Sequence, residues 1–351
     1  MTDSHEHLGI LISGTRLDPT DTIISKGLKP FYALHGAGAH TLGLTPMLSA
    51  HLWNTFCIPR MLYGITIYHL TKAMMSKLDR GQSHLFKRIL GVPTTAADES
   101  LYLLTGLPSI SRRIDLEKLL LLGQVLNLEH SRFERRTLLH AVTCHTTTIA
   151  SLKLILLKYD LPQLEELITV PIPYSKWKLL IKRSITTSTQ KEVYEAIPFK
   201  PSLGLWHGWS LNNPRALYPM NPPSSIVRQA LIARAQLLTS TYLLQTRLHK
   251  IKSGVDPTCP HCKEEDETIV HFIATCNSTS GIRQEFVKRH RNCLLDLPSP
   301  PNDYGPQNSG QFTRSTLLSY DPGLPQLINH DLLLCSLHFI YKLHIHHLSS
   351  N

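Results

Sequence analysis

The sequence predicts a mainly α-helical protein with a small metal-stapled module and a loose segment toward its C-terminus. Three observations lead to this prediction. Residues that start helices (Ser, Thr, Asp) and glycines that end them recur along the chain. Cysteine and histidine gather in the short window 259–276. Residues 297–325 are rich in Pro, Gly, Ser and Asn, which disfavours regular structure.

The first expected element is a strand, and helices follow it. Residues 7–12 form a short apolar run that Ser13 and Gly14 end, which predicts one buried strand. Four helix starts are then expected, at Thr45, Thr71, Asp98 and Ser109.

The ends of these helices follow from proline and glycine. Pro59 should kink or end the first, because proline lacks an N–H and clashes with the preceding turn. Gly91 and Gly106 should end the second and third. The fourth is rich in leucine and should run from residue 114 to about residue 128.

The second half of the chain is predicted to be helical in patches. Apolar periodicity marks helices at about 149–158, 163–168 and 174–187, and prolines then mark a linker at 198–224. Ser224 or Ser225 caps the longest predicted helix, about 225–250. The tail, residues 332–347, predicts an apolar helix. Its histidines (His338, His344, His346 and His347) have no spacing that requires a metal.

Composition favours a polyanionic partner. The chain has 351 residues, enough for two or three domains with a buried core. Its 36 Lys and Arg residues exceed its 26 Asp and Glu residues, which gives a net charge of +10. Such a charge favours RNA or DNA as the partner, and an inert basic surface is the alternative. No small-molecule substrate is evident.

The sequence also predicts an intracellular protein, nuclear or cytoplasmic. It has no uninterrupted apolar stretch of about 18 residues, so neither a membrane-spanning helix nor a membrane partner is expected. Residues 1–7 lack the basic and apolar regions of a secretory signal. The cysteines number seven, an odd count, and several are scattered, which fits a reducing compartment better than a disulfide framework.

Basic residues recur on three of the expected helices and are candidate phosphate contacts. The alternative is an ordinary solvated face or a basic helix end. The candidates are Lys72, Lys77, Arg80, Lys87 and Arg88 on the helix that ends at Gly91, Arg228 and Arg234 on the helix at 225–250, and Lys288, Arg289 and Arg291 after the Cys/His window.

The Cys/His window is the strongest single signal. Cys259, Cys262, His271 and Cys276 form the pattern C-x2-C-x8-H-x4-C. Thiolate and imidazole are the ligands that Zn²⁺ prefers, and four of them close a tetrahedral shell with no position for an activated water. The pattern therefore predicts structural zinc rather than a zinc hydrolase. The alternative is four unrelated side chains, with His271 buried on an apolar face.

Several blocks occur in a fixed order along the chain: HLGI at residues 7–10, LWNTFCIPRMLYG at 52–64, LGVP at 90–93 with LTGLP at 104–108, YSKWK at 174–178, and VRQALIAR at 227–234 ahead of the Cys/His window. Together they resemble the region that follows the palm of non-LTR (LINE-type) retrotransposon reverse transcriptases. The resemblance covers about residues 7–291.

The resemblance implies a domain order. Residues 1–40 would be a remnant of the palm edge (a strand plus a linker), 41–130 a thumb-like helical domain, and 131–223 a helical connector with a Pro-rich linker. Residues 224–292 would be a long helix with the CCHC zinc module, and 293–351 a loose segment with a C-terminal helix. The thumb-like helices would guide template and primer through contacts with the nucleic-acid backbone.

The chain departs from that family in its carboxylates. Family polymerases hold two Mg²⁺ ions on palm carboxylates that include a Tyr-x-Asp-Asp turn. No adjacent Asp pair occurs in this sequence, and the acidic pair Glu265-Asp266 lies within the Cys/His window. The resemblance therefore implies a C-terminal fragment that has no catalytic residue and is inactive alone, with Mg²⁺ expected only for the missing polymerase core.

Two further hypotheses come from other functional classes. Residues 288–292 resemble the start of the restriction-like nuclease of some of these elements, but no Pro-Asp pair follows them, so an intact nuclease is not expected. The other hypothesis is a zinc-stapled protein-interaction module that has no affinity for nucleic acid. Salt-dependent binding to RNA or DNA separates it from the leading hypothesis.

Overall fold

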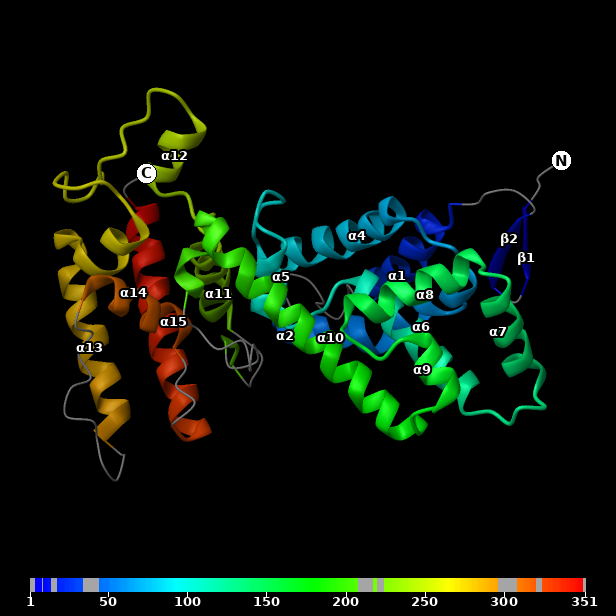
Figure 1. Cartoon of the computed structure of the whole chain (residues 1–351). Coiled ribbons are helices and arrows are strands. Elements are labelled where there is room, and N and C mark those ends of the chain that lie inside the picture. The colour runs from blue at the N-terminus through cyan, green and yellow to red at the C-terminus, as the bar shows by residue number, and fades with distance from the viewer. Residues whose placement is uncertain are drawn as a thin grey trace. The chain divides into compact units, whose positions relative to one another are not determined.

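The computed structural model describes residues 4–7, 9–13, 18–33, 44–207, 217–219, 224–295, 308–319 and 324–349 (Figure 1). Helices dominate these ranges, which confirms the predicted mainly α fold. Within them, no helix combines the length and apolar character needed to cross a membrane.

The chain packs as two compact units, each built from three segments that are distant in sequence. Unit 1 comprises Met1–Tyr32, Leu52–Gln82 and Pro108–Glu195. Unit 2 comprises Ala33–His51, Ser83–Leu107 and Ala196–Asn351.

Helices follow one another along most of the described chain. The first ten are α1 (Thr20–Ala33), α2 (Pro46–Leu52), α3 (Ile58–Leu62), α4 (Lys72–Leu90), α5 (Glu99–Thr105), α6 (Ile110–Leu126), α7 (Phe133–Thr143), α8 (Thr147–Lys158), α9 (Leu164–Thr169) and α10 (Tyr174–Ala196). The remaining ones are α11 (Ser225–Leu238), α12 (Gln245–Ile251), α13 (Ser280–Leu295), α14 (Ser309–Leu318) and α15 (Gln326–Leu348). Short 3-10 or π-helical turns occur at Trp53–Cys57, Ile65–Ile67, Ile197–Phe199, Pro201–Trp206, His271–Thr275 and Asn277–Thr279.

The prediction of a single strand at residues 7–12 was wrong. Two strands form instead, β1 (Ser4–His7) and β2 (Ile10–Ser13), and they pair antiparallel with His7 opposite Ile10. Gly9 between them has a φ of 77°, a left-handed conformation that glycine adopts without a steric penalty and that turns the chain back. Helix α1, which no pattern predicted, follows this hairpin.

Most of the predicted helix starts and ends are confirmed. The side-chain oxygens of four capping residues accept backbone N–H groups three residues later: Thr45 from Leu48, Thr71 from Met74, Ser109 from Arg112 and Ser224 from Val227. Gly91 and Gly106 both have positive φ at the ends of α4 and α5. Pro59 lies in the first turn of α3, where no N–H donor is required, and the regular helix α2 ends earlier, at Leu52.

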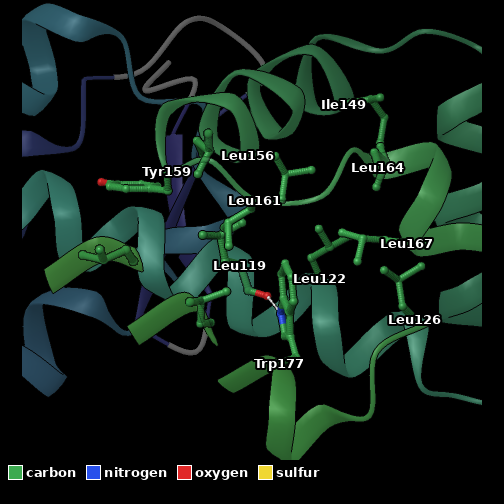
Figure 2. Close-up of a cluster of buried hydrophobic side chains, with 13 residues drawn as sticks. Leu119, Leu122, Leu126, Ile149, Leu156, Tyr159, Leu161, Leu164, Leu167 and Trp177 are labelled. Atoms are coloured by element: carbon green, nitrogen blue, oxygen red, sulfur yellow. Dashed lines mark hydrogen bonds between the residues drawn. The ribbon is translucent and has the colours of Figure 1, made fainter. Parts of the chain in front are cut away.

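Unit 1 has a core built by α6, α8, α9 and α10 (Figure 2). Trp177 on α10 is at its centre, and its indole N–H donates to the Leu119 carbonyl at 2.8 Å. The ring packs directly on Gly123, one helical turn further along α6. A buried indole with a satisfied N–H combines a large apolar area with a fixed orientation, so this contact sets the spacing of the two helices.

Replacement of Gly123 by Ala should destabilise unit 1. A Cβ at this position would lie 2.0 Å from Cδ1 of Trp177, so the ring or the helix must move. Overpacking of this kind costs about 1–3 kcal/mol of the free energy of unfolding, measured by urea denaturation. Gly281→Ala on α13 is the matched control, because its Cβ would meet no atom within 4 Å. Equal stability of the two variants would contradict this account of the core.

The predicted long helix at 225–250 is interrupted. Helix α11 ends at Leu238, Ser240 has a φ of 52°, and α12 begins at Gln245. The hydroxyl of Thr239 donates to the carbonyl of Ala235, and the Gln236 carbonyl accepts the N–H of Thr241. These local bonds complete the end of α11 and turn the chain, as Thr and Ser side chains do at helix ends.

Helices α11, α13 and α15 pack together in unit 2, with α15 in contact with both of the others (Figure 1). Phe286 of α13 stacks on Phe339 of α15, with ring centroids 4.6 Å apart. Part of the segment predicted to be loose is regular, because residues 309–318 form α14 and Phe312 packs edge-on against Phe286. The rest of 297–325 lies mostly outside the described residues.

Candidate metal centre

The Cys/His window folds into a compact turn before α13. The N–H of Cys259 donates to the Glu265 carbonyl, and the N–H of Lys263 donates to the Cys259 carbonyl, at 2.8 and 2.9 Å. Lys263 has a φ of 61°, so the chain reverses tightly between the first two cysteines and the acidic connector. This reversal directs the side chains of Cys259 and Cys262 toward the same point.

Four ligand atoms converge at that point. The Sγ atoms of Cys259 and Cys276 are 3.9 Å apart, and Cys262 Sγ is 3.3 Å from His271 Nε2. All four atoms lie within 4.8 Å of one another. Cys259, His271 and Cys276 are buried, and Cys262 is half-buried. The four side chains that the spacing predicted to act together do converge, and the cluster could bind a metal ion.

The imidazole of His271 is oriented by a carboxylate. Its Nδ1 lies 2.9 Å from Glu265 Oε2 and 3.2 Å from Thr275 Oγ1. A carboxylate only accepts, so Nδ1 carries the proton and Nε2 presents its lone pair to the cluster. A histidine that binds a metal usually has such a partner on its other nitrogen.

The electrostatics of the two leading cysteines differ. Burial raises the pKa of Cys259 to about 12. Burial also raises the pKa of Cys262, but the backbone N–H groups of Glu264 and Glu265 outweigh it, and the net pKa is lowered. Cys259 would therefore ionise only with a cation beside its sulfur, and a bound metal would supply that cation.

The module is tied to the start of α13. The guanidinium of Arg283 donates to the Cys276 carbonyl at 2.6 Å and to Thr279 Oγ1 at 2.8 Å. The position of this cation therefore depends on the fold of the ligand loop.

A basic pocket of about 710 Å³ lies beside this arginine, between α13 and α14. Its cations are Arg283, Lys288 and Arg291. Its other lining residues are Ala274, Ser280, Gln284, Val287, Asn292, Asn308, Ser309 and Phe312. Arg289 points elsewhere and pairs with Glu285 at 2.8 Å. The structure thus brings together two of the three basic residues predicted on this helix, and it adds Arg283.

Two other predicted phosphate contacts are buried. The ammonium of Lys87 lies 2.7 Å from Asp98 and donates to the Thr94 carbonyl at 2.9 Å. Asp98, predicted to cap α5 through its side chain, makes no such bond and accepts from Ser83 instead. Arg234 is 2% exposed, and burial lowers the pKa of its guanidinium. Neither cation faces solvent, where a phosphate could reach it.

The remaining candidates do not gather at one site. Lys77 pairs with Asp21 at 2.8 Å, and the Nε of Arg80 donates to the Ser76 carbonyl. Lys72 and Arg88 are exposed, and Arg228 is half-buried. Their charges contribute to the general positive field of the chain rather than to the basic pocket.

Sequence patterns missed a second cluster next to the module. His261, Glu267 and His347 come together there, the last from α15. The histidines of the tail were the only indication of this cluster in the sequence. Their spacing could not predict it, because His261 and Glu267 are distant from His347 along the chain.

No protein-family model matches this chain, and no curated protein or solved structure matches it either.

Substitution of Glu265 by Gln should weaken metal binding about tenfold. Loss of a partner to a ligating histidine costs 10- to 100-fold in metal affinity, and the side chain of Glu265 is 66% exposed, so we expect the lower end. Competition with a chromophoric chelator measures the change. The adjacent Glu264→Gln is the control, because that carboxylate accepts from Asn277 and not from a ligand. Identical affinities for both variants would rule out the assigned role.

Proposed function

We propose that this chain is a zinc-stapled nucleic-acid-binding protein, similar to the C-terminal portion of a non-LTR retrotransposon reverse transcriptase. The main support for the proposal is the basic pocket between α13 and α14. One of its cations, Arg283, is hydrogen-bonded to Cys276 of the metal module. RNA and DNA are both candidate ligands, because phosphate and base chemistry are shared between them. The ordered sequence blocks support the family assignment.

Zinc is the metal that the ligand set favours. Three thiolates and one imidazole suit Zn²⁺, whose bonds to sulfur are about 2.3 Å long and tetrahedral. Two sulfurs on such an ion are about 3.8 Å apart by that geometry, and the Cys259–Cys276 separation is 3.9 Å. Four protein ligands leave no open position, so the role is structural. The metal would contribute to the folding free energy of the module.

The pocket has the chemistry of a single-stranded nucleic-acid site. Arg283, Lys288 and Arg291 supply positive charge for the phosphate backbone. Phe312 lines the same pocket and offers an aromatic ring for base stacking, which tolerates any sequence. A volume of about 710 Å³ is within the range of pockets that hold a nucleotide-sized group. We therefore propose binding with strong salt dependence and weak sequence preference.

Replacing both Lys288 and Arg291 by Gln should weaken binding to single-stranded RNA. Each phosphate contact contributes about 0.7 to the slope of log affinity against log salt, so losing two should reduce the slope by about 1.4. Filter binding across a salt series measures this change.

The control is Lys176→Gln with Lys178→Gln, which removes the same charge from exposed positions on α10. An equal change in the control would show a general charge effect and would contradict the pocket assignment. Absence of binding by the unaltered chain would favour a zinc-stapled protein-interaction module instead.

The chain alone should show no templated DNA synthesis. The two-metal chemistry of polymerases requires paired carboxylates, and no adjacent Asp pair occurs in the sequence. Primer extension on an RNA template with Mg²⁺ measures the activity. Any template-dependent product would refute this part of the proposal.

A further inference from the structure

A second group of metal-binding side chains lies beside the Cys/His cluster. His261 comes from the turn between Cys259 and Cys262, Glu267 from the segment before His271, and His347 from the last turn of α15. One ligand atom of each lies within 4.8 Å of the others. We propose that these three residues bind a second divalent metal ion, which fastens α15 to the metal module.

Glu267 is the first argument for the site. The residue is 0% exposed, and its Oε2 accepts the N–H of Gln245 at the start of α12, at 2.7 Å. Its other oxygen, Oε1, is buried and has no hydrogen-bond donor, and it lies 3.3 Å from Nδ1 of His347. A buried carboxylate oxygen without a donor is costly, because water no longer solvates it. A cation at this oxygen removes the cost.

The tautomer of His347 is the second argument. Its Nε2 lies 3.3 Å from the Leu243 carbonyl, which only accepts, so Nε2 carries a proton and donates. In the neutral tautomer, Nδ1 then presents a lone pair to the carboxylate oxygen of Glu267. Two lone pairs repel unless a cation lies between them. The backbone carbonyl is also the partner that commonly orients a ligating histidine.

The cation between His347 and Glu267 is either a shared proton or a metal ion, and the position of His261 distinguishes these two alternatives. A proton needs only His347 and Glu267, whereas a metal needs further donors. The Nε2 of His261 is buried and has no hydrogen-bond partner, and its ring stacks on His346 at a centroid distance of 4.6 Å. The stacking fixes the ring plane beside the other two ligands. A third donor held at this point is explained by a metal ion and not by a shared proton.

The ligand set defines the class of metal. Two imidazoles and a carboxylate suit divalent first-row ions, with zinc the commonest. Three protein ligands leave a fourth position for water or an outside ligand, in contrast to the closed Cys/His shell. His261 lies between two ligands of that shell, so a metal in the Cys/His cluster fixes the loop that carries it. The second site should therefore fill after the first.

Cobalt titration of the metal-free full-length chain tests the proposal. Thiolate ligands give Co²⁺ a near-ultraviolet charge-transfer band that imidazole and carboxylate do not. The unaltered chain should bind about two equivalents, and only the first should raise the thiolate band. His347→Gln and His261→Gln should each bind about one equivalent with the thiolate band intact, which also shows that the module still folds.

His338→Gln on α15 is the matched control and should retain both equivalents, because His338 lies outside the cluster. The proposal is overturned if the unaltered chain binds only the thiolate-linked equivalent, or if His338→Gln loses as much metal as His347→Gln. It does not depend on nucleic-acid binding, and its readout is independent of that activity. If cobalt produces no thiolate band in the unaltered chain, the Cys/His metal centre is refuted instead.

Discussion

The constraint on which the metal module depends is the burial of sulfur. Cys259 and Cys276 are 1% and 2% exposed, and their sulfurs lie 3.9 Å apart. Burial raises the pKa of Cys259 and so opposes its ionisation. A divalent cation bound by the cluster would reverse this by favouring the thiolate form, and metal binding would then be coupled to folding of the module.

The consequences extend from the module to α13. The carbonyl of Cys276, itself a ligand residue, accepts from Arg283, so the arginine is positioned by the fold of the loop rather than by its own helix. Lys288 and Arg291 are three residues apart, about one turn of α13, and they line the same pocket as Arg283. Arg289 lies on another face and pairs with Glu285. The basic pocket thus combines one cation that the Cys/His loop positions with two cations that lie one turn apart on α13.

The sequence predicted well what depends on neighbouring residues. Caps such as Ser109 and Ser224 act within three residues of their own position, and glycines such as Gly91 need only a local left-handed turn. The prediction was wrong where one residue that turns the chain lies inside a longer apolar or helical pattern. Gly9 split one expected strand into two, and the turn at Ser240 divided one expected helix.

The sequence by itself determined the helical class and the four ligands of the Cys/His cluster, because both follow from spacing over a few turns. Only the tertiary structure determined which charged side chains are buried and which are exposed to solvent. Lys87 is buried and paired with Asp98, although its position in the helical pattern made it as good a candidate phosphate contact as the exposed Lys72. The tertiary structure also brought His347 of the tail to Glu267. Burial and distant pairing depend on which helices pack together, and local spacing does not encode that choice.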